Sequence, residues 1–210
     1  MIKGVKRTVG ILFLLLLTGT STASTSDRFA KELLAETNLA RTNPHRYAGY
    51  LRDLRRNFSG KVYRIPGTAN LVVTSEGVAA VDDAIAFLEK QRSVPPLQWS
   101  AGLARAAADL VNEQGRTGGV GHNGGDSGDM EARIEKHGSW VRRIAENIGY
   151  GPDTPRLMVM ELIIDDKVPD RGHRKNIFNH GLSVAGAACG PHPRYRYMCV
   201  MDFAGGFTGK

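Results

Sequence analysis

Two histidines of this chain lie in glycine-rich segments where neither a helix nor a strand is expected. His122 occurs in "VGHNGGDSGDM" and His173 in "PDRGHRKNIF", each directly after a glycine. Because Gly121 and Gly172 carry no side chain, we expect the backbone to bend sharply there and the imidazoles to reach inward. Two imidazoles with one or two carboxylates are what a zinc-like ion needs, with open positions left for water.

The acids that could join these histidines are Glu146, in "RIAENIGY", and Asp165 and Asp166, at the end of a nearly all-apolar segment. Glu146 follows apolar residues, where a carboxylate is costly unless it is paired or bound to a metal. An ion pair with Arg142 or Arg143, or a capping role, is the alternative interpretation of Glu146. The spacing contains no local chelate, so from the residues alone a shared metal site stays one hypothesis among these.

Other chemistry has weaker support in the sequence. The segment "DSGDME" offers Asp126, Asp129 and Glu131 to calcium, but it does not match a twelve-residue EF-hand loop. The chain has no G-x-S-x-G elbow, so a serine hydrolase is not supported. Four further histidines are predicted to be structural or solvent-exposed: His45, His137, His180 and His192.

The first 23 residues have the three-part layout of a secretory signal peptide. Basic residues in "MIKGVKRTVG" precede the apolar run "ILFLLLL" and the small, polar "TGTSTAS", and we expect cleavage after Ala23. An uncleaved anchor is the alternative, although the apolar run is short for a bilayer span. We therefore predict a secreted or periplasmic protein with no stable membrane span after cleavage.

The charge balance of the remaining chain is mild. The full sequence has 28 basic and 21 acidic side chains, and residues 1–23 contain three of the basic ones. The remaining net charge of +4 is compatible with an anionic envelope surface, but no nucleic-acid-binding motif accompanies it. About 187 residues suit one hydrophobic core. We predict a single domain over 24–210, with a helical part (24–96) packed on a core (97–210).

Cys189 and Cys199 are the only cysteines, and in an exported protein they are predicted to form a disulfide. The flanking segments "VAGAACG" and "RYMCVMDF" indicate two strands, at about 182–188 and 197–203, joined by the turn "PHPRY". Two buried free thiols are the alternative.

Capping residues and apolar spacing predict the helices that surround these strands. With a further strand at "AENIGYG", they predict an α/β protein with helices layered on a small, mostly antiparallel sheet. Residues 59–74 are predicted to be loop with a short strand. The predicted helices are about 27–41 with Asp27 as N-cap, 44–58 after Asn43, 78–88, 101–115 between Ser100 and Gly115, 130–137, 155–164 after Thr154, and a turn or two at "GHRKNIF".

In order and spacing, these segments resemble the CAP superfamily, which includes cysteine-rich secretory proteins, venom allergens and pathogenesis-related proteins. The resemblance runs from about residue 30 to 207 through "ETNLARTNPHRYA", "LQWSAGLARAAADL", "AENIGYG" and "VPDRGHRKNIF", and it is closest to the bacterial form. It implies a three-layer α-β-α sandwich with a cleft lined by two histidines and two acids. In some members the histidines bind a divalent ion.

Three positions of that pattern are clear in this chain. The first histidine corresponds to His122, the second to His173, and the acid of the "GEN" motif to Glu146, where Ala145 replaces the glycine.

The second acid of the pattern has three candidates in this chain. It is expected one turn after a tryptophan, which Leu162 replaces here, and this places Asp165 in that role. Asp166 and Glu161 are the other candidates. An aspartate reaches less far than a glutamate, so we do not expect it to bind a metal directly.

The resemblance favours a binding protein, expected to be a monomer, whose cleft holds a divalent ion such as zinc and contacts a lipid, an envelope glycan or a protein. One alternative is a zinc-dependent, peptidase-like hydrolase with Glu146 as general base. Another is a lipid or sterol carrier with an apolar groove. The "HYTQ" segment of the eukaryotic members is absent and one cysteine pair replaces several disulfides, so their activities transfer poorly.

Overall fold

The computed structural model describes residues 25–65 and 67–210, and the signal peptide predicted over residues 1–23 lies outside them. The helices are α1 (Thr25–Thr42), α2 (Pro44–Arg55), α3 (Val78–Lys90), α4 (Ala101–Thr117), α5 (Met130–His137), α6 (Pro155–Ile164) and α7 (Gly172–Ile177). The strands are β1 (Phe58–Ser59), β2 (Val62–Arg64), β3 (Leu71–Val73), β4 (Gln98–Trp99), β5 (Gly138–Trp140), β6 (Ile144–Tyr150), β7 (Val184–His192), β8 (Arg196–Ala204) and β9 (Phe207–Gly209).

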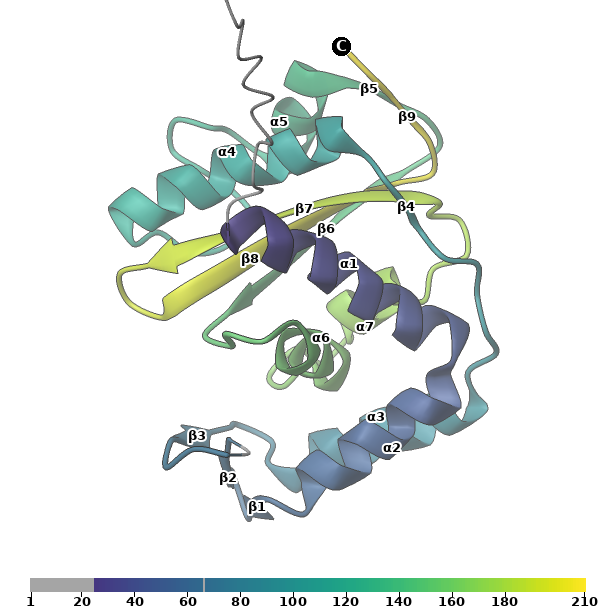
Figure 1. Cartoon of the computed structure of the whole chain (residues 1–210), viewed down its shortest axis with the longest axis vertical. Coiled ribbons are helices and arrows are strands. Elements are labelled where there is room, and N and C mark those ends of the chain that lie inside the picture. The colour runs from purple at the N-terminus through teal and green to yellow at the C-terminus, as the bar shows by residue number, and fades with distance from the viewer. Residues whose placement is uncertain (1–24, 66) are drawn as a thin grey trace, which may run out of the picture.

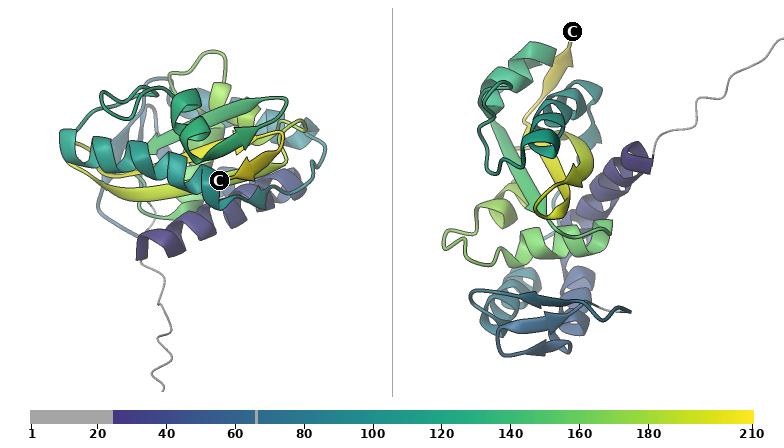
Figure 2. Two further views of the ribbon diagram at one scale, coloured as in Figure 1. Left: turned by 90° about the horizontal axis from the view of Figure 1, so that it is seen from above. Right: turned by 90° about the vertical axis from the view of Figure 1, so that its left-hand side faces the viewer.

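The central sheet has the strand order β4-β7-β8-β6, and only the β4–β7 pair is parallel. Helices α4 and α5 cover one face of this sheet, and α1 and α6 lie on the other (Figure 1). This arrangement confirms the predicted α/β sandwich with a small, mostly antiparallel sheet. Beyond α6, helices α2 and α3 pack with the small sheet β1-β2-β3 at one end of the molecule (Figure 2).

Helix α4 illustrates how local sequence and packing combine. As predicted, Ser100 caps the start of α4, and its hydroxyl accepts a hydrogen bond from the backbone N–H of Leu103. The predicted stop at Gly115 is wrong, because the helix continues to Thr117 and ends at Gly118, whose φ of 73° suits a residue without Cβ. Gly186 on β7 lets α4 approach the sheet, since a Cβ there would lie 2.0 Å from the helix backbone.

The N-terminal part differs from the prediction in two places. Helix α1 begins at Thr25, so Asp27 lies in its first turn and is not the N-cap. Residues 59–74, expected to be mostly loop, contribute to the antiparallel sheet β1-β2-β3. Phe58 leaves the second helix to begin this sheet and stacks on Tyr63 with ring centroids 4.8 Å apart. Pairing across the sheet thus overrides the local helical spacing.

The long hairpin of β7 and β8 is more extended than the sequence predicted, and it carries the disulfide. Cys189 and Cys199 are directly opposite each other in the register and are bonded, which confirms the predicted pair. In the part of the chain that the structure describes, no helix is long and apolar enough to cross a bilayer.

Candidate functional site

The fold brings His122 and His173 together, with ring centroids 6.4 Å apart and ring planes inclined by 31°. His122 comes from the loop between α4 and α5, and His173 from the first turn of α7. Each ring is bonded to one of the predicted acids, Glu146 or Asp165. The four residues of the predicted cleft therefore form two adjacent histidine–carboxylate pairs.

In the first pair, His122 Nδ1 lies 2.8 Å from Glu146 Oε1. The Glu146 side chain projects from β6 and is only 1% exposed, whereas the His122 side chain is 55% exposed. The buried acid thus orients an imidazole that remains open to solvent.

The partner of Glu146 is Arg133 of α5, which sequence reasoning missed. Arg133 Nη2 lies 2.5 Å from Glu146 Oε2, and both side chains are buried. Arg133 Nη1 also donates to the carbonyl of His122 at 3.1 Å. The proposed ion pair of Glu146 with Arg142 or Arg143 is therefore wrong, because the packing of α5 on β6 supplies a buried arginine thirteen residues away.

A third acid, Asp202, is fully buried behind the first pair. It lies on β8 directly opposite Glu146 on β6. No donor of the described residues reaches its carboxyl oxygens, so its available hydrogen bond is one to Glu146 through a proton on Asp202 itself. Burial raises the pKa of Asp202 well above its ordinary value, and the negative charge of Glu146 raises it further while Arg133 lowers it. The burial of Asp202 and the adjacent Glu146 carboxylate therefore both favour the protonated form of Asp202.

The backbone beside His122 is bent as the sequence predicted. Gly121 has a φ of 92°, a left-handed conformation that favours glycine. Its N–H donates to the Tyr150 hydroxyl at 2.9 Å, and its carbonyl accepts from Gln114 Nε2 at 2.8 Å. These bonds fix the loop that presents His122.

The acidic part of the same loop has a structural role. Asp129 caps α5 by accepting the backbone N–H of Ala132 at 2.9 Å, and Glu113 accepts the backbone N–H groups of Gly125, Asp126 and Ser127. Within the described ranges, no group of three or more His, Cys, Asp or Glu residues is arranged to hold a metal ion. This finding covers the acidic loop and the two histidine–carboxylate pairs alike.

In the second pair, Asp165 ends α6 in a left-handed conformation with a φ of 59°. Its Oδ1 lies 2.6 Å from His173 Nδ1, and its Oδ2 accepts the backbone N–H of the same histidine at 2.9 Å. The sharp bend before His173 occurs at Arg171, with a φ of 53°, and Gly172 is helical. The expected role of Gly172 is therefore wrong, because side-chain bonds hold Arg171 in the unfavourable conformation.

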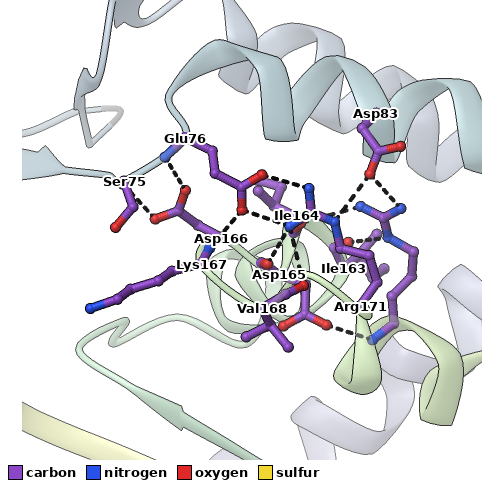
Figure 3. Close-up of polar contacts among 11 residues, drawn as sticks. Ser75, Glu76, Asp83, Ile163, Ile164, Asp165, Asp166, Lys167, Val168 and Arg171 are labelled. Carbon is purple, nitrogen blue, oxygen red and sulfur yellow. Dashed lines mark hydrogen bonds and ion pairs between the residues drawn. The ribbon is translucent and has the colours of Figure 1, made fainter.

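The other two candidates for the second acid have different partners. Asp166 accepts the backbone N–H groups of Ser75 and Glu76, each at 2.7 Å, and so joins the turn after α6 to the segment before α3 (Figure 3). Glu161 accepts a hydrogen bond from the Tyr63 hydroxyl at 2.5 Å. Neither acid is bonded to a histidine in the structure, whereas Asp165 is.

Two asparagines that the sequence analysis did not single out join β6 to α7. Asn147 Nδ2 donates to the carbonyl of His173 at 3.1 Å, and Asn176 Nδ2 donates to Asn147 Oδ1 at 2.9 Å. They fix the distance between the strand that carries Glu146 and the helix that carries His173. The sequence indicated these asparagines only through their positions close to Glu146 and His173.

Arg171 connects the second pair to the N-terminal part. Its Nη1 donates to the carbonyl of Asp165 at 2.7 Å, and its Nη2 lies 2.7 Å from Glu76 Oε2 (Figure 3). The hydrogen bonds from Arg171 and from the backbone N–H of Lys167 lower the pKa of Glu76 to about 2.

We expect Glu76→Gln to destabilise the protein at neutral pH by about 1 kcal/mol, a value reduced because solvent reaches this pair. Because the pKa of Glu76 is lowered in the folded state, its contribution is present above the ordinary value of 4.5 and is lost as pH falls toward 2. Urea unfolding at pH 7 and at pH 3 measures the difference between variant and wild type. Glu32→Gln, at an exposed ion pair, is the control. A difference that stays constant or grows as the pH falls would contradict this prediction.

The family model described as CAP, the cysteine-rich secretory protein family, matches residues 35–203. None of the curated proteins is a significant match to the sequence.

Three solved structures are similar to the chain. An extracellular protein with an SCP domain from Bacillus anthracis has 15% identity and a TM-score of 0.44, over 60% of this chain and 37% of that protein. An outer surface protein from Borrelia burgdorferi has 16% identity and a TM-score of 0.44, over 56% of this chain and 80% of its own. A cysteine-rich secretory protein from Staphylococcus aureus has 15% identity and a TM-score of 0.39, over 60% of this chain and 37% of that protein.

The match thus spans well under half of the Bacillus and Staphylococcus proteins. The family model, in contrast, covers most of this chain, from the middle of α1 to the end of β8. The chain therefore belongs to the CAP, or cysteine-rich secretory protein, family.

Proposed function

We propose that this chain is an exported CAP-domain protein that binds its target in the cleft at His122 and His173, with a divalent metal ion held by the two imidazoles. The observation that carries this proposal is the pairing of each Nδ1 with a buried carboxylate. A carboxylate acceptor at Nδ1 favours the tautomer in which Nε2 has a free lone pair for a metal. Within the described residues, neither Nε2 has a hydrogen-bond partner.

The distance between the rings suits a shared ion after a small adjustment. A zinc ion bound to a histidine nitrogen lies about 3.2 Å from the ring centroid, so two rings on one tetrahedral ion are about 5 Å apart. The observed separation of His122 and His173 is 6.4 Å. A movement of roughly 1 Å, within reach of the exposed His122 side chain, would bring the rings together. Water and the bound target would supply the other ligands.

The geometry favours binding over hydrolysis. A catalytic zinc normally has three protein ligands, and two imidazoles are available here. Glu146, the expected general base, has one oxygen on His122 and the other on Arg133, and its side chain is buried. This position suits an acid that orients His122 better than one that takes a proton from water.

Zinc titration of the protein, freed of metal with a chelator, tests the proposal. We expect one zinc per chain by calorimetry, with the affinity lowered about tenfold or more in His122→Ala and in His173→Ala. Asp165→Asn should lower the affinity by about tenfold through the orientation of His173.

His180→Ala is the matched control, since His180 is an exposed histidine outside the two pairs. It should bind zinc as the wild type does. Equal loss in the control, or zinc binding that survives both cleft substitutions, would rule out the shared site.

Export is inferred from the basic and apolar segments of residues 1–23 and agrees with the disulfide, which persists in oxidising compartments. The target is therefore expected at the cell envelope or outside the cell.

One observation favours a second candidate function, that of a lipid or sterol carrier. A groove of about 760 Å³ lies between α1 and α4 over β7, and Ala30, Trp99 and Val111 are among its apolar lining residues. A groove of this size is sufficient for a ligand of moderate length. Mass spectrometry of an organic extract of the purified protein would detect a lipid carried there, and this candidate fails if none co-purifies.

A further inference from the structure

A second cavity, of about 420 Å³, lies between α6 and the small sheet β1-β2-β3. Its lining is largely apolar and aromatic, and the acid Glu161 of α6 also lines it. The apolar and aromatic lining residues include Phe58, Tyr63, Val72, Ile148, Met158 and Leu162. Because these residues come from distant parts of the chain, only the packed fold forms this cavity.

Only one oxygen of Glu161 is bonded to another residue of the described chain. Its Oε1 accepts the hydrogen bond from Tyr63, whereas no described residue bonds its Oε2, which is not among the fully buried oxygens and so is open to the cavity. No lysine, arginine or histidine in the described ranges forms an ion pair with Glu161. A carboxyl group that borders a cavity with one open oxygen and no counter-cation can gain a charge-assisted hydrogen bond from a ligand.

The charged residues around the cavity favour a ligand with a positive charge. Asp165 and Asp166 also line the cavity, and their oxygens are occupied by His173 and by backbone N–H groups. Lys167 and His173 are the basic residues of the lining. Burial raises the pKa of Glu161, the hydrogen bond from Tyr63 lowers it and the charge of Asp166 raises it, and together they bring it to about 7. An anionic ligand would add repulsion to this group, whereas a cation would relieve it.

We infer that this cavity binds an organic ammonium ion with an apolar body, whose N–H groups donate to Glu161 Oε2. The apolar body would pack against Met158 and Leu162, and the stacked rings of Phe58 and Tyr63 offer aromatic surface near the cation. An ammonium group has three donors and no acceptor, which matches a lone carboxyl oxygen. This site adjoins the histidine cleft, because His173 and Asp165 also line the cavity, but it goes beyond the proposed function and requires no metal at the histidines.

Calorimetric titration with n-hexylamine, n-hexanol and hexanoate tests this inference, because the three probes share an apolar chain and differ in the polar group. We expect hexylamine to bind one per chain, hexanol at least about tenfold more weakly, and hexanoate not at all. Glu161→Gln should weaken hexylamine at least about tenfold and leave hexanol unchanged. Glu32→Gln, the same change at an exposed acid of α1, should bind hexylamine as the wild type does.

The pH dependence supplies a second readout. With a pKa of about 7 in the free protein, Glu161 is mostly protonated at pH 6, so ammonium binding must displace its proton. We therefore expect hexylamine to bind more tightly at pH 8 than at pH 6, with proton release at pH 6. Glu161→Gln should abolish this dependence. Because burial raises the pKa of Tyr63, Tyr63 does not titrate here, and His173→Ala separates any contribution from the imidazole.

The outcomes are distinct from those for the histidine site. If Glu161→Gln binds zinc normally and loses hexylamine, the inference is supported whether or not the metal proposal holds. Equal binding of hexylamine and hexanol, unchanged hexylamine binding in Glu161→Gln, or no hexylamine binding at all would overturn it.

Discussion

Arg133→Ala is expected to lower the free energy of unfolding by about 3–5 kcal/mol, measured by urea denaturation at neutral pH. The substitution removes the buried cation from Glu146 Oε2 and leaves that carboxylate without a counter-charge beside the buried Asp202. It also removes the hydrogen bond to the carbonyl of His122. Breaking one side of a buried pair costs more than a surface pair contributes, because the remaining charge cannot regain water.

Arg28→Ala is the matched control, since this arginine is 77% exposed and pairs with Glu32 on the same helix. It should change the free energy by less than about 0.5 kcal/mol. If Arg133→Ala does not fold, Glu146→Gln gives a milder test, because the amide keeps the shape and still accepts one hydrogen bond. A loss of about 1–2 kcal/mol is expected there. A change in Arg133→Ala no larger than the control would show that the buried charge is neutralised in another way.

Arg41→Ala should destabilise the protein by about 3 kcal/mol or more, for a different reason. Arg41 is fully buried at the end of α1 and donates only to backbone carbonyls, namely those of Pro95, Ile177, Asn179 and Leu182, at 2.6–3.2 Å. Burial lowers its pKa to about 10, so it remains charged at neutral pH. Each buried carbonyl left without a donor costs about 1–3 kcal/mol, partly offset because the guanidinium no longer has to be desolvated.

The several N–H donors of the guanidinium group make this prediction specific to arginine. Arg41→Lys keeps the charge but cannot serve four carbonyls from two chain segments, so about half of the loss is expected. Arg56→Ala, at a side chain that is 80% exposed, is the control and should have little effect. Chemical denaturation of the three variants compares them directly. If Arg41→Lys were as stable as the wild type, the charge alone would account for the role of Arg41.

Local signals predicted much of the fold. Asn43, Ser100 and Thr154 each accept the capping hydrogen bond that their residue types suggest, because a helix N-terminus and its cap are close in sequence. The cysteine pair followed from composition and the hairpin pattern. The failures arose where packing overrides a local signal. Gly115, for example, is tolerated inside α4 because the packing of the helix outweighs the cost of one glycine.

By itself, the sequence indicated the fold class, the disulfide and three of the four paired residues, His122, Glu146 and His173, since each depends on short motifs or on their order along the chain. The structure then paired Asp165, one of three candidate acids, with His173. Only the tertiary structure decided which groups share a buried charge. Arg133 and Asp202 join Glu146 because α5 and β8 pack against β6, and Glu161 meets Tyr63 because the small sheet folds over α6. The energy of a buried ionisable group depends on the neighbours that replace water in three dimensions, and spacing along the chain does not record those neighbours.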